Sequence, residues 1–221
     1  MSIATMILGQ SGTGKTTSLR NLNPSDVLLL QAVKKPLPFR SKGWAACSKD
    51  HPEGSILVTD QAPIIVKAMH RTAKPIIVID DFQYILANEF MRRVLDKETG
   101  NAAFAKYNEI ARSAWDILMA AGQLADHKRV YILAHTQEDD CGRIKAKTIG
   151  KLLDEKITLE GLLTIVLRTA VINGQYVFST KNNGLDTVKS PMGLFESEHI
   201  DNDLAVIDAA ISDYYNLTIP A

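Results

Sequence analysis

The sequence lacks any hydrophobic run long enough to cross a membrane. Its uncharged apolar runs, such as residues 3–8 and 75–79, are far shorter than the roughly 20 residues that a membrane-spanning helix needs. The chain also begins without the basic region, apolar stretch and cleavage site of a signal peptide. We therefore expect no membrane partner and a location in the cytoplasm.

Cysteine is scarce, and the residue patterns of several common reactive sites are missing. Cys47 and Cys141 are the two cysteines of the chain and form no C-x-x-C pair, so we expect no disulfide framework. The five histidines are scattered, and neither cysteine has a partner at zinc-ligand spacing. No G-x-S-x-G sequence occurs, which argues against a serine hydrolase elbow. A reducing compartment fits these absences.

Charge is balanced overall but uneven along the chain. The 25 Lys and Arg residues match the 25 Asp and Glu residues, which removes the simplest argument for a nucleic-acid partner. Basic residues gather in two runs, residues 34–42 and 143–151, whereas the segment from residue 196 onward carries six acids and no Lys or Arg. Basic runs of this kind can contact phosphate, although most are solvated surfaces.

Short β-type runs alternate with helical patterns, which is typical of βαβ units around a parallel sheet. The expected strands are residues 3–8, 26–31, 55–59, 76–79 and 130–134. The expected helices are residues 15–21, 61–71, a segment through 84–90, and 104–125. No repeat, low-complexity tract or linker interrupts this order, so we expect residues 1–221 to form one α/β domain.

The C-terminal third of the chain predicts a hairpin and a closing helix. Asn173-Gly174 is its strongest turn signal and separates β-type runs at residues 163–172 and 175–180. Apolar residues at helical spacing follow Asp201 and Asp203. This pattern predicts a capped helix over about residues 201–216 that packs on the core.

Residues 9–16 fit the pattern G-x-x-x-x-G-K-[ST] completely, between an expected strand and an expected helix. Glycines let backbone N–H groups turn inward around phosphate oxygens, and the following helix presents its N-terminus to the anion. We expect Lys15 to reach the β- and γ-phosphates of ATP and the Thr16 hydroxyl to ligate Mg²⁺. The predicted nucleotide-binding residues are consecutive: Gly9, Gln10, Ser11, Gly12, Thr13, Gly14, Lys15, Thr16 and Thr17.

Two carboxylates, Asp80 and Asp81, follow the apolar run at residues 76–79. A phosphate-loop enzyme needs an acid at such a strand end to hold Mg²⁺, and we assign this role to Asp80. Asp81 is interpreted as the catalytic acid that orients or deprotonates the attacking water. Each has a structural alternative, a helix N-cap for Asp80 and a first-turn acid that suits the helix dipole for Asp81.

The expected strand at residues 130–134 also ends in polar residues. Ligands of α/β sheets bind beyond the carboxyl ends of the strands, so Thr136 or Gln137 is expected near the γ-phosphate or the water. We assign to Gln137 the catalytic role of reporting the state of the nucleotide. A capping or surface role is the alternative for each residue, and His135 is interpreted as a hydrogen-bonded strand end.

Aromatic side chains accompany the first basic run. Phe39 lies within this run and Trp44 lies just after it. Such a mixture can stack on DNA bases and hold phosphates. Phe39 can equally pack against a nucleotide base, and both rings can belong to the core. The sequence leaves these three interpretations open.

The order of these parts resembles the RecA-type recombinase core over residues 3–195. That family has a phosphate loop, a strand with the magnesium aspartate, a DNA-binding loop, a long helix, a strand ending in Gln, a second DNA-binding loop and a hairpin. The corresponding parts here are residues 9–16, Asp80, residues 96–101 and 104–125, Gln137, residues 138–147 and the Asn173-Gly174 hairpin. The resemblance implies a three-layer α/β P-loop NTPase fold of RecA-like type, with a mostly parallel central sheet and a C-terminal antiparallel hairpin.

Four short strings, residues 35–39, 79–84, 188–193 and 200–204, resemble a narrower group. It consists of short phage-encoded ATPases of the AAA/RecA type that are linked with single-strand annealing recombination. This resemblance implies an Mg²⁺-dependent ATPase of the host bacterial cytoplasm. The partners that it implies are single-stranded DNA, a single-strand-binding protein and further copies of the chain.

The sequence departs from the recombinase pattern in three places. The equivalent of the second DNA-binding loop carries three acids, residues 138–140, before its basic run, which weakens the electrostatic case for DNA. RecA-type recombinases carry their catalytic Glu at the end of the strand after the phosphate-loop helix, but residues 28–34 contain no acid. We therefore expect Asp81 to substitute and hydrolysis to be slow or stimulated by DNA. The chain also begins close to its first strand, so we expect no filament formation through the N-terminal segment that docks neighbouring protomers in that family. If protomers stack, Lys181 and Arg168 are the residues expected to reach a neighbour's γ-phosphate.

Other functions of a phosphate loop fit the sequence less well. A small-molecule kinase usually carries an arginine-rich lid, and no arginine cluster occurs here. A GTPase switch needs Asp-x-x-Gly after the acidic strand and Asn-Lys-x-Asp as base reader, and neither is present. A nucleotide-gated partner or assembly module with little turnover remains the alternative to the ATPase.

Overall fold

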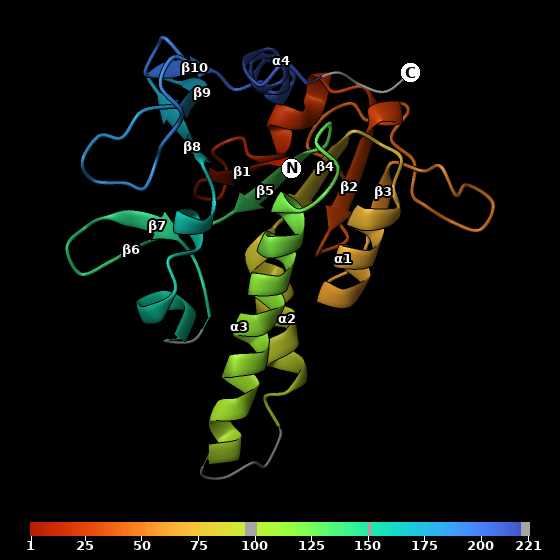
Figure 1. The fold of residues 1–221 in the computed structure, drawn as a ribbon, viewed down its shortest axis with the longest axis vertical. Helices are drawn as coiled ribbons and strands as arrows, with labels where there is room; N and C mark the ends of the chain where they lie inside the picture. The colour runs from red at the N-terminus through yellow and green to blue at the C-terminus, as the bar shows by residue number, and fades with distance from the viewer. Residues whose placement is uncertain (96–100, 150–151, 218–221) are drawn as a thin grey trace.

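The computed structural model describes residues 1–95, 101–149 and 152–217. Its centre is a sheet of eight strands, most of which are parallel (Figure 1). The strands follow the order β10-β9-β8-β1-β5-β4-β2-β3. All pairs from β8 to β3 are parallel, whereas β8–β9 and β9–β10 are antiparallel. The strand bounds are β1 Ile3–Leu8, β2 Val27–Gln31, β3 Ile56–Val58, β4 Ile76–Asp80, β5 Arg129–Ala134, β8 Ile165–Ile172, β9 Gln175–Ser179 and β10 His199–Asp201.

Helices cover both faces of this sheet. One hydrophobic core lies under α1, α2 and α3, and a second lies under α4 and the short helix after the phosphate loop. The α-helices are α1 Ala62–Arg71, α2 Phe82–Arg92, α3 Asn101–Gly122 and α4 Leu204–Tyr214. The shorter helices are the 3₁₀ helices Thr16–Asn21, Pro24–Asp26 and Leu159–Leu162, and the π-helix Leu152–Lys156.

The two cores follow from the apolar strands. In β1, Met6 and Leu8 lie in the core under α1–α3, whereas Ile7 between them lies in the core under α4. Successive side chains of a strand point to opposite faces, so a strand covered on both faces must be apolar at nearly every position. The continuous apolar runs thus build the helix–sheet–helix arrangement, and the predicted three-layer α/β P-loop NTPase fold is confirmed.

The C-terminal hairpin is also confirmed. β8 and β9 pair in antiparallel fashion around Asn173 and Gly174, whose φ angles are 51° and 80°. Two consecutive positive φ angles are what the Asn-Gly pair favours in a tight hairpin turn. Helix α4 begins at Leu204, and Asp203 caps it by accepting a hydrogen bond from the Ala205 backbone N–H at 3.0 Å.

Three short strands were not predicted from the sequence. β6 (Thr136–Glu138) and β7 (Ile144–Ala146) form a separate two-stranded hairpin that includes most of the expected second DNA-binding loop, residues 138–147, and β10 extends the main sheet. Each has three residues, too few for a recognisable alternation of apolar and polar side chains. The expected first DNA-binding loop falls on residues 96–101, of which 96–100 lie outside the described residues, as does Lys151 of the second basic run.

No helix in the described part of the chain is both long and apolar enough to cross a membrane.

Candidate functional site

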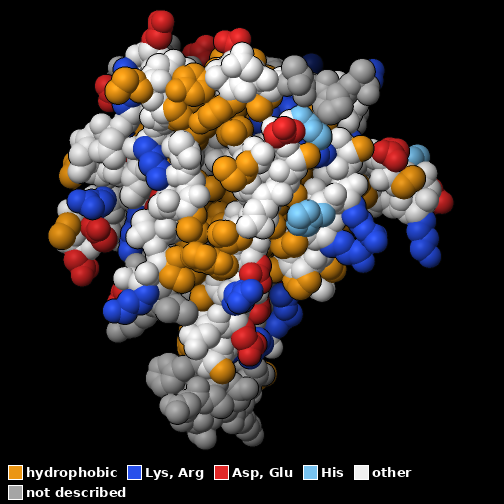
Figure 2. Space-filling model, viewed as in Figure 1, with side chains coloured by type: hydrophobic (Ala, Val, Ile, Leu, Met, Phe, Trp, Pro, Cys, Tyr) orange, Lys and Arg blue, Asp and Glu red, His pale blue; other side chains and the backbone are white. Residues whose placement is uncertain are grey.

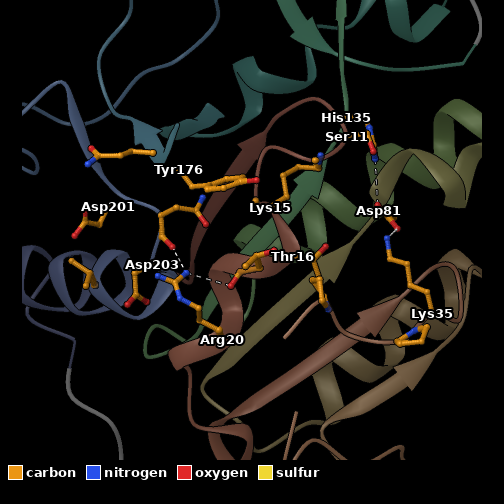
Figure 3. Close-up of a pocket in the computed structure, with 18 of the residues that line it drawn as sticks. Ser11, Lys15, Thr16, Arg20, Lys35, Asp81, His135, Tyr176, Asp201 and Asp203 are labelled. Atoms are coloured by element: carbon orange, nitrogen blue, oxygen red, sulfur yellow. Dashed lines mark hydrogen bonds and ion pairs between the residues drawn. The ribbon is translucent and has the colours of Figure 1, made fainter. Parts of the chain in front are cut away.

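A cavity of about 830 Å³ lies at the carboxyl ends of β1, β4 and β5. The phosphate loop, the segment after β2, the tip of the β8–β9 hairpin and the turn between β10 and α4 line it. In the view of Figure 3, Asp81, His135 and Lys35 lie at one end, Tyr176, Asp201 and Asp203 lie at the other, and Lys15 and Thr16 lie between them. Segments far apart in the sequence thus meet at one site.

The phosphate loop leaves β1 in a conformation that its glycines permit. Gly12 and Gly14 have φ angles of 81° and 95°, which residues with a Cβ rarely adopt. A Cβ on Gly9 would lie 2.0 Å from Thr169 Oγ1, so the first loop position also has no room for a side chain. Thr169 of β8 fixes the loop through a 2.6 Å hydrogen bond between its hydroxyl and that of Thr13.

Gly14→Ala is expected to lower the free energy of unfolding by about 1–3 kcal/mol and to weaken nucleotide binding. The new Cβ would require an unfavourable φ and would lie 2.9 Å from Asn202 Oδ1. Urea unfolding and fluorescence titration with ATP measure the two effects. Gly142→Ala is the matched control, because Gly142 also has a positive φ, 75°, but no atom within 4 Å of its Cβ position. Equal stability and equal nucleotide affinity of the two variants would contradict the expectation.

Lys15 is buried beside the loop. Its Nζ donates hydrogen bonds to the carbonyl oxygens of Gly9 and Gln10, both at 2.8 Å. Burial lowers the pKa of Lys15 to about 8, although the charges of Asp81 and Asp80 oppose this shift. An anion in contact with this ammonium would favour its charged form. The side chain is therefore suited to bind phosphate, as its motif predicts.

Thr16 and Asp80 lie together, as a shared magnesium site requires. The Thr16 hydroxyl lies 3.1 Å from each carboxylate oxygen of Asp80, and Asp80 is almost fully buried. Burial, reinforced by the charge of Asp81, raises the pKa of Asp80 to about 6, while Lys35, Thr16 and Lys15 act in the opposite direction. Mg²⁺ takes few protein oxygens and completes its shell with water and phosphate, so these two donors fit it.

Among the described residues no cluster of three or more His, Cys, Asp or Glu side chains is placed to hold a metal ion.

The two acids differ in their backbone positions. Asp80 is the last residue of β4, so its helix N-cap alternative does not hold. Asp81 occupies the N-cap position of α2 with φ 58° and ψ 46°, but its side chain makes no capping hydrogen bond. Its carboxylate instead pairs with Lys35 Nζ through Oδ2 and lies 3.5 Å from His135 Nε2 through Oδ1. Asp81 thus combines a left-handed backbone conformation with a side chain that lines the cavity.

His135, rather than Gln137, lines the cavity at the end of β5. β5 ends at Ala134, and Gln137 lies in β6, where it is paired in register with Lys145. The His135 backbone N–H donates to Gln83 Oε1 at 3.2 Å. Burial and the charge of Lys15 lower the pKa of His135, and Asp81 opposes this. The structure thus brings Lys15, Thr16, Asp80 and Asp81 together but does not place Gln137 with them.

Several residues of the site carry no sequence motif. Tyr176, half-exposed at the hairpin, and Asn202, buried in the turn before α4, line the end of the cavity away from Asp81. The Asn202 carbonyl accepts a hydrogen bond from Arg20, and its Nδ2 has no hydrogen-bond partner among the described residues. Asn21 Nδ2 donates to Asp203 Oδ2 at 2.6 Å. These contacts join the phosphate-loop helix to the C-terminal region.

The aromatic residues of the first basic run pack against the protein. Phe39 and Trp44 are partly buried against the core under α4, with ring centroids 5.9 Å apart in an edge-to-face arrangement. Of the three interpretations of these rings, the structure supports core packing.

Comparisons with known proteins add little. No protein-family model matches the chain, and no curated protein matches it. One solved structure that it resembles is described as "a prototypical ATPase from the type III secretion system of pathogenic bacteria", with 12% sequence identity and a TM-score of 0.44. The match covers 76% of this chain and 51% of that one, so the chain spans about half the length of this structure.

Proposed function

We propose that the chain is an Mg²⁺-dependent ATPase that acts with single-stranded DNA in recombination or annealing, in the cytoplasm of a phage's bacterial host. The observation that carries the ATPase part is the convergence of Lys15, Thr16 and Asp81 on one cavity at the end of the sheet, with the buried Asp80 carboxylate accepting a hydrogen bond from Thr16. The DNA part depends on the resemblance to recombinase cores and to phage annealing ATPases.

The proposed reaction uses these side chains. A water oxygen attacks the γ-phosphorus, the bond to the β–γ bridging oxygen breaks, and ADP leaves with the electron pair. Asp81 orients this water and accepts its proton, and Lys15 stabilises the negative charge on the phosphate oxygens. Bound Mg²⁺, held by Thr16 and Asp80, supplies further charge neutralisation. We still predict that Gln137 reports the state of the bound nucleotide. It would do so through the β6–β7 hairpin, which begins directly after His135.

The β6–β7 hairpin is the element that we propose for DNA contact. Arg143 and Lys147 are exposed on it, but so are Glu138 and Asp140 near its turn. Figure 2 shows Lys and Arg side chains next to Asp and Glu side chains at the edge of the molecule where Figure 1 places β6 and β7. A mixed surface of this kind supports weak, salt-sensitive binding rather than a strongly basic groove.

Other partners are proposed from the resemblance alone. They are a single-strand-binding protein and further copies of the chain. The two residues expected to act on a neighbour's γ-phosphate have contacts within their own chain. Lys181 Nζ donates to the Glu196 carbonyl oxygen at 2.6 Å, and Arg168 pairs with Asp186 at 3.1 Å.

The test of this function is ATP hydrolysis with Mg²⁺, measured with and without single-stranded DNA, for the wild type and Asp81→Asn. We expect DNA to stimulate the wild type and the substitution to lower the turnover rate by about 100-fold or more, because the amide cannot accept the proton. Asp50→Asn, at an exposed acid outside the cavity, is the control and should match the wild type.

A nucleotide-gated partner or assembly module is the second candidate. It is favoured by residues 28–34, which contain no acid, and by the ion pair that engages Asp81. ATP binding without turnover and without a response to DNA would contradict the ATPase and leave this candidate.

A further inference from the structure

The cavity has a second lysine in its wall, Lys35, which the fold places there. Gln31, buried at the end of β2, donates from Nε2 to the Lys35 carbonyl oxygen at 3.3 Å. Pro36 follows Lys35 and disfavours helical backbone angles at it. The preceding residue, Lys34, is exposed and does not line the cavity. The position of Lys35 is therefore specific and does not merely reflect a basic run.

Lys35 lies at the same end of the cavity as Asp81 and His135 (Figure 3). Its Nζ pairs with Asp81 Oδ2, and the Asp81 side chain is only 5% exposed while that of Lys35 is 40% exposed. An ammonium group has three hydrogen-bond donors. Within the described residues Asp81 is the acceptor in contact with Nζ, so the group can hold a second anion while it holds this carboxylate.

The charges nearby indicate which anion this is. Burial lowers the pKa of Lys35, but the hydrogen bond to Asp81 and the charges of Asp80 and Asp81 outweigh it and raise this pKa overall, so the group carries its charge. Lys15, the residue expected to reach the β- and γ-phosphates, lines the same cavity as Lys35 and Asp81. Arg20, another cation of the cavity wall, donates to the Asn202 carbonyl oxygen at the opposite end. Of Lys35 and Arg20, Lys35 is thus the cation at the end of the cavity that holds Asp81.

We propose that Lys35 binds the γ-phosphate of ATP while it holds the Asp81 carboxylate, so that the site distinguishes a nucleoside triphosphate from a diphosphate. This inference rests on the proposed function. One ammonium would contact the group that is transferred and the acid that orients the attacking water. A cation fixed at this place stabilises the charge on the transferred phosphoryl group, and it is supplied here by the same chain.

Equilibrium titrations with ADP and with a non-hydrolysable ATP analogue test the inference. The variants are Lys35→Met, which keeps the apolar stem of the side chain, Lys35→Arg, which keeps the charge, and Lys34→Ala as the neighbouring control. We expect Lys35→Met to weaken binding of the triphosphate analogue at least tenfold and binding of ADP less than twofold. Lys35→Arg should recover part of the loss, and Lys34→Ala should leave both affinities unchanged.

Unchanged ADP affinity also shows that Lys35→Met is folded. An equal loss for both nucleotides, or no loss for either, would overturn the role of Lys35. Hydrolysis by Lys35→Met that is faster than in the wild type would overturn it as well. If the wild type binds both nucleotides without hydrolysing ATP, the proposed ATPase fails while the affinity ratio still decides the role of Lys35. If the wild type binds neither, both proposals fail.

Discussion

Lys15→Ala is expected to weaken ATP binding and to lower the rate of hydrolysis by about 100-fold or more. The buried ammonium donates hydrogen bonds to two carbonyl oxygens of the phosphate loop, and the charges of Asp80 and Asp81 act on it. Removing it leaves the charge of the phosphates without its nearest cation from the protein. Titration with a fluorescent ATP analogue and a phosphate-release assay measure the two losses.

Lys49→Ala is the control for this substitution, because Lys49 is exposed and lies outside the cavity. Binding in the Lys15→Ala variant within a factor of three of the wild type would mean that the loop is not a phosphate site. The stability of this variant should change little, since the burial that lowers the pKa of Lys15 also makes the charged side chain costly in the folded state.

Asp208→Ala is expected to have the largest effect on stability, a loss of about 3–5 kcal/mol. Arg129 of β5 donates to Asp208 of α4 through Nε at 2.9 Å and Nη2 at 2.8 Å, and the Tyr131 hydroxyl lies 2.6 Å from Asp208 Oδ1. The Arg129 side chain is only 3% exposed. Without the carboxylate, a buried guanidinium would lose its counter-charge. Urea denaturation followed by circular dichroism measures the change.

Asp213→Ala, at an exposed acid of the same helix, controls for the loss of a negative charge and should change the free energy of unfolding by less than about 0.5 kcal/mol. A loss below about 1 kcal/mol in Asp208→Ala would show that water reaches Arg129 easily. In that case the ion pair would not be what holds α4 on the sheet.

Sequence reasoning identified those parts of the site that a short, contiguous stretch of sequence determines. The phosphate loop is a contiguous motif, and Asp80 directly follows an apolar strand, so both could be assigned without knowledge of the fold. Thr169 could not be found in this way, because it meets Thr13 only after β8 pairs with β1, and 156 positions separate the two residues. Asn202 belongs to the string at residues 200–204 that carries part of the resemblance, but its position beside Gly14 was missed for the same reason.

Two other differences between the predicted and the observed site have causes in the neighbouring sequence. Lys35 was grouped with the basic run at residues 34–42, because a sequence does not show which of two neighbouring lysines faces a cavity. Gln137 was assigned because it is one of the polar residues that follow the expected strand at residues 130–134. The strand does end at Ala134, but the chain then enters a second hairpin, so that His135 and not Gln137 lines the cavity.

The central position of β1 has a consequence for how the chain is made. β1 is synthesised before the other strands of the sheet, yet its two neighbours in the sheet are β5 and β8, which end at Ala134 and Ile172. At about 5–20 residues per second, the ribosome needs on the order of ten seconds or more to reach β8 after it completes β1. Until β5 is made, an apolar strand with unpaired backbone groups has no native partner on either side. The phosphate loop is thus translated well before Thr169 of β8, which fixes its conformation.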